Sequence, residues 1–220
     1  LLYLIEDDIV VKVDKTNYSN ALSFYGWEDI DFIWESQIGD AYLILDCGSS
    51  GDCLFHSIAE ALNLKQIYSN SNNVEELDFY HVDSLRKAAS SKITIDNFTI
   101  ILESYKLEDE LGEFQGDWDP NKITCIEELQ SEIEKSGNNF WGDHITIQLL
   151  STALQINFVI LNCNDDEDVS YTTVEIPGNK GFIILYYLNN CHFTLVGKFD
   201  GKRMNVIFKT IPNEIKKCLM

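Results

Sequence analysis

Cys53 is the residue of the chain that is best placed to act as a reactive group, because it lies where a polar loop meets an apolar helical segment. The loop contains Ser50, Gly51 and Asp52. The free N–H groups and dipole of a first helical turn stabilise a thiolate, so we expect this position to lower the pKa of Cys53. Gly51 permits backbone angles that aim several N–H groups at one point, as an oxyanion hole requires. The pattern predicts a thiolate nucleophile; a buried structural cysteine beside an ordinary helix cap is the alternative.

A thiolate nucleophile needs a general base, and the chain contains 4 histidines. His56 lies on the flank of the helix that begins at Cys53, His81 lies in a polar stretch, and His144 lies in the first turn of another helix. His192 opens an apolar strand after a tight loop, so its ring is expected to project from a sheet edge. A cysteine at a helix N-terminus facing a histidine on a sheet is the papain-type arrangement. That Cys53 and His192 meet is a hypothesis, because periodicity does not test it.

Helical periodicity and strand-like runs indicate how these residues are positioned. Four helices are expected: 53–64, one capped by Asp83 with Leu85 and Ala89 buried, one that starts at a Thr124–Glu127 capping box, and 143–155. Strands are expected at 10–13, 157–161, 171–176, 182–188, 192–196 and 204–208. Helices followed by strands predict an α+β fold, with helices flanking a central, mostly antiparallel sheet.

Composition excludes several functional classes. The 220 residues include 16 Lys plus Arg and 36 Asp plus Glu, a net charge of −20, which argues against binding to nucleic acid. No apolar run approaches the roughly 18 residues of a membrane span. The first segment carries Glu6, Asp7 and Asp8, unlike a secretory signal, and the absence of an initial Met suggests a fragment. Sparse cysteines predict reduced thiols in the cytosol.

Three sequence blocks resemble the ovarian-tumour (OTU) cysteine proteases. The block 51–58, Gly-Asp-Cys-Leu-Phe-His-Ser-Ile, resembles the nucleophile motif of the family. The block that starts at Trp141-Gly142-Asp143 and continues through 149–154 resembles the second, and His192-Phe193 resembles the last. The blocks occur in family order between about residues 45 and 199. The resemblance implies a papain-like fold and a deubiquitinase that hydrolyses isopeptide bonds at the C-terminal glycine of ubiquitin, without a cofactor.

The resemblance also implies roles for individual residues. Ser50, Gly51 and Asp52 would form the oxyanion hole, although the family commonly has Asp at the position of Ser50. Thr194 stands where the family often has the Asp or Asn that orients the histidine. We favour Thr194 or Asn190 as the third catalytic residue; Asp14 and the acidic stretches 108–119 and 165–168 stay open, since some members use an upstream acid or only a Cys–His pair. Trp141 or Phe193 would border the channel for the Gly-Gly end of ubiquitin, and either is equally well explained as a core aromatic.

The expected organisation is an N-terminal extension at 1–40, a catalytic domain at 41–200 with a helical recognition arm at 65–137, and a C-terminal strand and tail at 201–220. The expected partner is ubiquitin, polyubiquitin or a ubiquitin-like modifier, bound by a monomer in the cytosol. Diverged flanks suggest a viral or intracellular-pathogen origin, hence the host cytosol and a role in immune evasion. The arginines of the ubiquitin tail suit a strongly acidic surface.

Other functions remain as alternatives. Thr194 in the third position motivates a catalytically weak or inactive ubiquitin-binding domain. Another papain-like acyl transferase is a further option. A zinc site would use Cys47, Cys53, Cys191 and His192, but their spacing fits no usual ligand pattern. A calcium loop at 165–168 lacks the required spacing and glycine.

Overall fold

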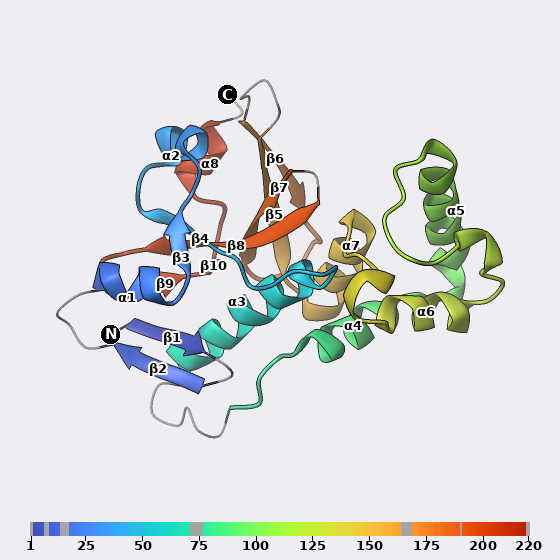
Figure 1. The fold of residues 1–220 in the computed structure, drawn as a ribbon, viewed down its shortest axis with the longest axis horizontal. Coiled ribbons are helices and arrows are strands. Elements are labelled where there is room, and N and C mark those ends of the chain that lie inside the picture. Colours follow the sequence, from blue (N-terminus) through green and yellow to red (C-terminus); the bar gives the residue numbers. More distant parts are fainter. Residues whose placement is uncertain are drawn as a thin grey trace.

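The computed structural model describes residues 2–6, 9–13, 18–70, 77–163, 169–189 and 191–218. A central mixed sheet and a separate hairpin contain the described strands (Figure 1). The strands are β1 (Leu2–Glu6), β2 (Ile9–Val13), β3 (Trp27–Asp29), β4 (Tyr42–Leu45), β5 (Asn157–Cys163), β6 (Val169–Val174), β7 (Phe182–Leu188), β8 (His192–Phe199), β9 (Met204–Asn205) and β10 (Ile207–Phe208). The main order is β3-β4-β8-β7-β5-β6. Among the described strands β5 and β7 form the one parallel pair, so the expected α+β fold with a mostly antiparallel sheet is confirmed.

All four expected helices are present among the helices of the described residues. The helices are α1 (Tyr18–Phe24), α2 (Phe32–Ile38), α3 (Cys53–Ser69), α4 (Val82–Ser90), α5 (Ile95–Leu111), α6 (Ile126–Glu134), α7 (His144–Leu154) and α8 (Asn213–Lys217). Two expected caps were wrong. His81, not Asp83, caps α4 through a box with Ser84. The N-cap residue of α6 is Cys125, one position after Thr124. The N–H and hydroxyl of Thr124 donate to Glu128 rather than Glu127.

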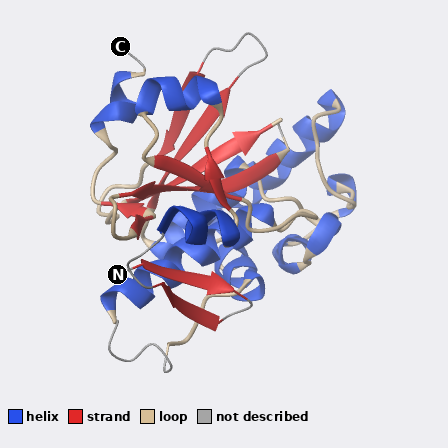
Figure 2. Cartoon of the chain, turned by 60° about the vertical axis from the view of Figure 1, so that its left-hand side comes forward, coloured by secondary structure: helices blue, strands red, loops and turns tan. Residues whose placement is uncertain are grey.

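The two faces of the sheet carry separate hydrophobic cores. Successive strand side chains point to opposite faces, so Ile183 and Leu185 pack toward α3, whereas Ile184 and Tyr186 pack toward α2 and α8. Helix α3 lies between the sheet and the β1–β2 hairpin (Figures 1 and 2). Buried residues therefore occur on nearly every side of α3, as expected for a helix enclosed by other elements. Cys53, the first residue of α3, is thus held by a rigid element.

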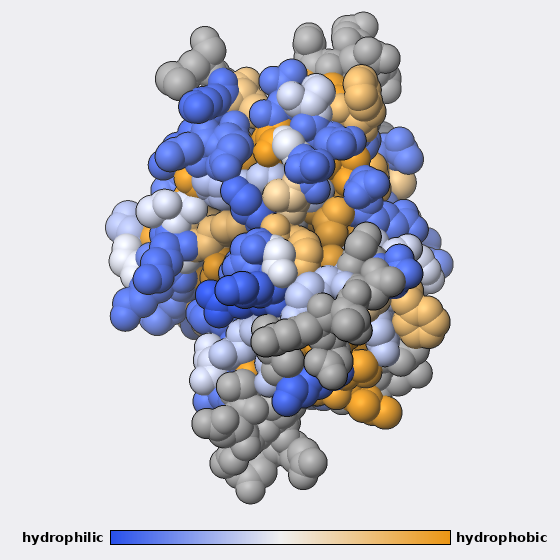
Figure 3. Space-filling view, turned by 90° about the vertical axis from the view of Figure 1, so that its left-hand side faces the viewer, coloured by the Kyte–Doolittle hydropathy of each residue, from blue (hydrophilic) through white to orange (hydrophobic). Residues whose placement is uncertain are grey.

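Helices α5 and α6 project to one side of the sheet, and α4 joins them to α3 (Figure 1). Parts of both terminal segments join the central sheet: β3 pairs with β4, β9 with β8, and β10 with β7. Hydrophilic residues cover much of the face that carries α1, α2 and the N-terminal hairpin (Figure 3). In the part of the chain that the structure describes, no helix combines the length and apolar character of a membrane span.

Candidate active site

Cys53 lies beside the start of β8. Its side chain is 4% exposed, and its sulfur accepts a hydrogen bond from the Phe193 N–H, with an N–S distance of 3.5 Å. Because His192 directly precedes Phe193, the N-terminus of α3 and the histidine strand meet, in agreement with the hypothesis. The structure thus brings the Cys53 segment and the His192 segment into one site.

The pKa of the Cys53 thiol is raised, not lowered, which corrects the expectation from the sequence. Burial is the largest cause, because it penalises the charged thiolate. Backbone N–H groups of Phe193, Leu54 and Cys53 itself act in the opposite direction, as expected at a helix N-terminus. The negative charge of Asp46 adds a smaller upward shift of the Cys53 pKa. Loss of water around the sulfur therefore outweighs the backbone donors.

The imidazole of His192 bonds to an aspartate that the sequence analysis missed. His192 Nε2 lies 3.1 Å from Asp46 Oδ1. Asp46 directly follows β4, which pairs antiparallel with β8 in a register that sets Leu45 opposite Leu195. The end of β4 and the start of β8 therefore share one sheet edge. With Nε2 engaged by Asp46, Nδ1 is the ring nitrogen left for another partner, so Cys53, His192 and Asp46 are candidates for a catalytic triad.

Thr194 does not occupy the third position. It is 1% exposed in the middle of β8, and its hydroxyl bonds to the Tyr186 carbonyl at 3.5 Å. Of the other suggestions, Asn190, Asp14 and the acidic stretch 165–168 lie outside the described residues, whereas the stretch 108–119 is described and lies at the end of α5 and in the loop after it. A usable signal for Asp46 was present: it is an acid immediately after the apolar run 42–45, upstream of the nucleophile.

The loop before Cys53 has an unusual backbone. Ser50 and Gly51 both have positive φ angles, 69° and 80°. A side chain on Gly51 would collide with the Gly137 carbonyl oxygen and press on Trp141, so the position requires glycine. Ser50 adopts this strained region without that freedom, and such outliers occur where the surroundings fix the backbone. The loop therefore has a fixed shape, as backbone oxyanion donors require.

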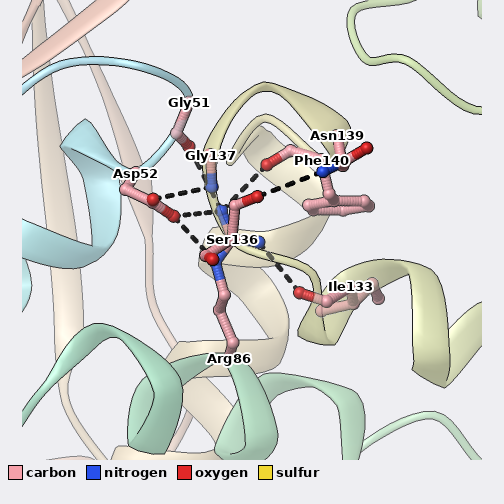
Figure 4. A network of polar contacts seen from close by, with 8 residues as sticks. All are labelled: Gly51, Asp52, Arg86, Ile133, Ser136, Gly137, Asn139 and Phe140. Carbon is pink, nitrogen blue, oxygen red and sulfur yellow. Dashed lines mark hydrogen bonds and ion pairs between the residues drawn. The ribbon is translucent and has the colours of Figure 1, made fainter.

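A buried arginine holds this loop in place (Figure 4). Arg86 of α4 is 0% exposed, and its guanidinium carbon lies 4.1 Å from the centroid of the Phe55 ring. Its guanidinium donates to the Asp52 carboxylate at 2.9 Å and to the carbonyl oxygens of Ile133 at 2.9 Å, Phe140 at 2.9 Å and Gly51 at 3.4 Å. The second Asp52 oxygen accepts the Gly137 N–H at 2.7 Å. The Asp52 side chain thus clamps the loop to the segment that leads to Trp141, and only its backbone remains for the oxyanion role.

A cavity of about 390 Å³ lies between the arm and the sheet, and both expected substrate-binding residues line it. Trp141 is half-buried; Phe193 is 6% exposed and stacks on Tyr187 with ring centroids 4.5 Å apart. Glu108, Glu113 and Asp143 also line the cavity. Burial and the charge of Asp143 raise the pKa of Glu108, and burial raises that of Asp143. A cation in the cavity would relieve this accumulation of carboxyl groups.

No three His, Cys, Asp or Glu side chains gather as a metal site within the described ranges. Cys47, one of the suggested zinc ligands, has a thiol that contacts the Leu45 carbonyl oxygen at 3.5 Å, and burial raises its pKa well above the usual value. A thiol of this kind is poorly nucleophilic.

A cysteine at a helix N-terminus, a histidine on the adjacent sheet edge and an acid behind it define the class of papain-like cysteine hydrolases. Within that class, residues 48–193 match the model of the OTU-like cysteine protease family, and the chain belongs to this family. No curated protein matches the chain in sequence.

Solved structures of OTU domains resemble the fold at low identity. An ovarian tumor (OTU) domain in complex with ubiquitin is 18% identical, with a TM-score of 0.47, covering 81% of this chain and 80% of that one. An OTU deubiquitinase from Wolbachia pipientis wMel is 13% identical, with a TM-score of 0.46, covering 81% and 96%. The viral OTU domain protease of Dera Ghazi Khan virus is 14% identical, with a TM-score of 0.39, covering 73% and 83%.

Proposed function

We propose that this chain is a deubiquitinase that hydrolyses isopeptide bonds at the C-terminal glycine of ubiquitin. The observation that carries the proposal is the alignment of the Cys53 thiol, the start of β8 and the His192–Asp46 hydrogen bond at one sheet edge. Membership of the OTU-like cysteine protease family supports the reaction type.

The proposed reaction follows from this geometry. His192 Nδ1 takes the thiol proton, and Cys53 sulfur attacks the isopeptide carbonyl carbon. Backbone N–H groups of the 50–53 loop stabilise the oxyanion. The carbon–nitrogen bond breaks as the imidazolium returns its proton to the lysine amine. His192 then activates water, which hydrolyses the thioester and frees the ubiquitin carboxylate. Asp46 orients the imidazole and stabilises its positive charge.

The acidic cavity supports ubiquitin as the substrate. The tail of ubiquitin carries arginines before its two terminal glycines. Trp141 and Phe193 place the cavity next to the nucleophile, and Glu108, Glu113 and Asp143 supply the charge for a guanidinium.

A ubiquitin probe with a C-terminal thiol-reactive group tests the proposal. We expect one adduct, on Cys53, which Cys53→Ala abolishes and which Cys191→Ala leaves intact. Cys191 is the matched control because it is exposed, and iodoacetamide should therefore label it without recognition by ubiquitin. His192→Ala should lose turnover while it keeps ubiquitin binding. An adduct on Cys53→Ala would overturn the nucleophile assignment.

One observation favours a second candidate, a catalytically weak or inactive ubiquitin-binding domain. The sulfur of Cys53 is buried and its pKa is raised, so little thiolate forms in the free protein. Turnover of ubiquitin-aminomethylcoumarin separates the candidates. An enzyme loses its rate in Cys53→Ala, whereas a binding domain shows the same background rate in both proteins and still binds ubiquitin.

A further inference from the structure

A groove at the other end of α3 is lined by an unusual set of charges. Its volume is about 600 Å³, and Lys65, Tyr68 and Ser69 of α3 form one wall. Lys180 lies in the turn before β7, and the β9–β10 segment from Arg203 to Lys209 forms another wall. We call this site the basic groove. Cys53 begins α3, and the groove residues Lys65 to Ser69 end it, so the basic groove lies about 18–24 Å from the nucleophile along the helix at the usual rise per residue.

Its charge is opposite to that of the protein as a whole. The chain has 36 acidic and 16 basic residues, yet four of the basic residues line this groove and no Asp or Glu is among the described residues that do so. A surface with the average composition of the chain would have more acids than bases. The positive potential of the groove is therefore a local property that the rest of the acidic surface does not share.

Three of the four cations are free to bind. Lys65, Lys180 and Lys209 are exposed and form no ion pair with any residue in the described ranges. Arg203 has a weak partner, Asp200, at 3.8 Å, and both side chains are about half exposed. Pairing with an external anion thus requires no strong internal pair to break.

The groove also has an apolar floor. Met204 and Val206 are buried beneath it, while Ile207 and Phe208 are half-buried and line it. Tyr68 is fixed from behind, since its hydroxyl accepts the N–H groups of Tyr3 and Met204, each at 3.2 Å. A free phosphate or a nucleic-acid backbone would use the cations but not this floor. A peptide with both acidic and apolar side chains uses both.

We propose that the basic groove binds an acidic, extended polypeptide segment of a partner protein, with an apolar side chain on the β9–β10 floor. Strands β9 and β10, which pair with β8 and β7, line the groove. An extended peptide bound there would therefore lie beside extended backbone. The size falls within the range of ligand sites, roughly 300–1,000 Å³. This site does not depend on the proposed ubiquitin hydrolysis and serves to recruit a partner away from the cleft.

Fluorescence anisotropy with a labelled peptide tests the proposal. The probe is a Glu-rich dodecapeptide with a central Leu-Phe pair; the comparison peptides replace every Glu by Gln, or Leu-Phe by Ser-Ser. We expect saturable binding of the acidic peptide and at least about tenfold weaker binding of each comparison peptide. The charge-reversed variant Lys65→Glu, Lys180→Glu, Lys209→Glu should lose binding by at least about tenfold.

The matched control reverses three exposed lysines elsewhere, Lys87→Glu, Lys216→Glu and Lys217→Glu. It should bind the probe within about twofold of wild type, and both triple variants should keep the wild-type melting temperature. Lack of saturation at about 1 mM peptide, or equal loss in both variants, contradicts the proposal. Equally tight binding of polyphosphate would assign the groove to phosphate instead. Self-association that only the groove variant abolishes would assign it to a second copy of the chain.

Discussion

At the scale of single residues, Asp46 acts on the site in two ways, through a hydrogen bond and through its charge. Its carboxylate bonds to the His192 ring, and its charge contributes to the raised pKa of Cys53. A carboxylate favours a positively charged imidazolium and disfavours a negatively charged thiolate. The two effects of Asp46 therefore oppose each other when a thiolate and an imidazolium form together. Asp46 is 66% exposed at its side chain, so water screens both.

Asp46→Asn tests this balance. Asparagine keeps an oxygen near Nε2 but removes the charge, so kcat should fall about tenfold to a hundredfold with KM nearly unchanged. The pH midpoint of Cys53 alkylation should move downward, because one cause of the raised pKa is gone. Asp40→Asn, the same kind of change at an exposed residue before the other end of β4, is the control. An upward midpoint, or an unchanged kcat, would contradict the role.

Arg86 is a positioning residue, since it contacts the loop and not the thiol. Arg86→Lys keeps the charge but cannot reach all four acceptors, because lysine has no planar fork of donors. We expect a loss of about 3 kcal/mol in the free energy of unfolding, as for a broken buried pair. At a temperature where the variant is fully folded, kcat should still fall while KM changes little.

A merely structural role for Arg86 predicts a different result: normal kcat in the folded fraction. Circular dichroism measures the folded fraction, and the alkylation rate of Cys53 reports the local geometry without substrate. Arg203→Lys, an exposed arginine outside the cleft, is the matched control and should change neither quantity.

At the scale of elements, the N-terminal end of α7 forms part of the cavity wall. The Asp143 side chain accepts the Thr146 N–H at 2.7 Å and its hydroxyl at 2.9 Å. Burial raises the pKa of Asp143 above its usual value, and the bonds from Thr146 only partly oppose this. The cap is therefore stabilising as a hydrogen-bond acceptor but costly as a charge.

Asp143→Asn keeps the cap without the charge, and Asp143→Ala removes both. Alanine should cost about 1 kcal/mol. Because the folded pKa is raised, wild type loses stability as pH rises from the ordinary range of Asp through that raised pKa. Asparagine does not titrate. The melting temperature of Asp143→Asn should therefore rise relative to that of wild type as pH increases across that window, and the two should be equal at lower pH. If the melting temperature of Asp143→Asn instead rose relative to wild type as pH fell, the raised pKa of Asp143 would be contradicted.

The elements also show how far the sequence predicts this molecule. Helix α3 was predictable because its core positions repeat at helical spacing. Helix α5 was missed because its apolar residues occupy two faces: Ile101 and Tyr105 are buried, but Leu107 and Leu111 are exposed. Periodicity reports a buried face and cannot register an apolar face left open.

The acidic partner of His192 was missed for a related reason. The family resemblance suggested Thr194, two residues after His192, but the pairing of β8 with β7 sets Thr194 opposite Tyr186, whose carbonyl oxygen accepts its hydroxyl. Asp46 reaches His192 only through the pairing of β4 with β8, a contact between residues far apart in the chain. Likewise, Arg86 meets Asp52 through tertiary packing that the sequence does not encode locally.

At the scale of the whole molecule, charge and apolar surface on the arm coincide. Leu107 and Leu111 are 55% and 63% exposed on α5, next to the carboxylates of 108–110. Phe114 and Trp118, which the sequence places in the same acidic stretch, instead pack on Tyr105 at the base of the arm, with centroids 6.0 and 5.3 Å away. The exposed part of the arm therefore combines Leu107 and Leu111 with the carboxylates of Asp109 and Glu110, and we propose that it contacts the basic, partly apolar face of ubiquitin.

Neutralising this face tests whether it recognises substrate. In the variant Glu108→Gln, Asp109→Asn, Glu110→Gln, KM should rise several-fold and its salt dependence should weaken, because long-range attraction to ubiquitin is reduced. The value of kcat should stay nearly constant, since none of these side chains contacts the thiol, and Asn at 109 keeps an acceptor for Asn121. Steady-state kinetics across a salt series measures both effects.

The control must remove the same charge elsewhere, because lowering a net charge of −20 changes association in any case. Glu28→Gln, Asp29→Asn, Asp40→Asn does this at two exposed residues of β3 and one before β4, and β3 lies on the side of the molecule away from the arm (Figure 1). If the arm binds ubiquitin, the arm variant changes KM much more than this control. Equal changes would mean that net charge alone steers ubiquitin, and an unchanged KM in the arm variant would place the contact on another surface.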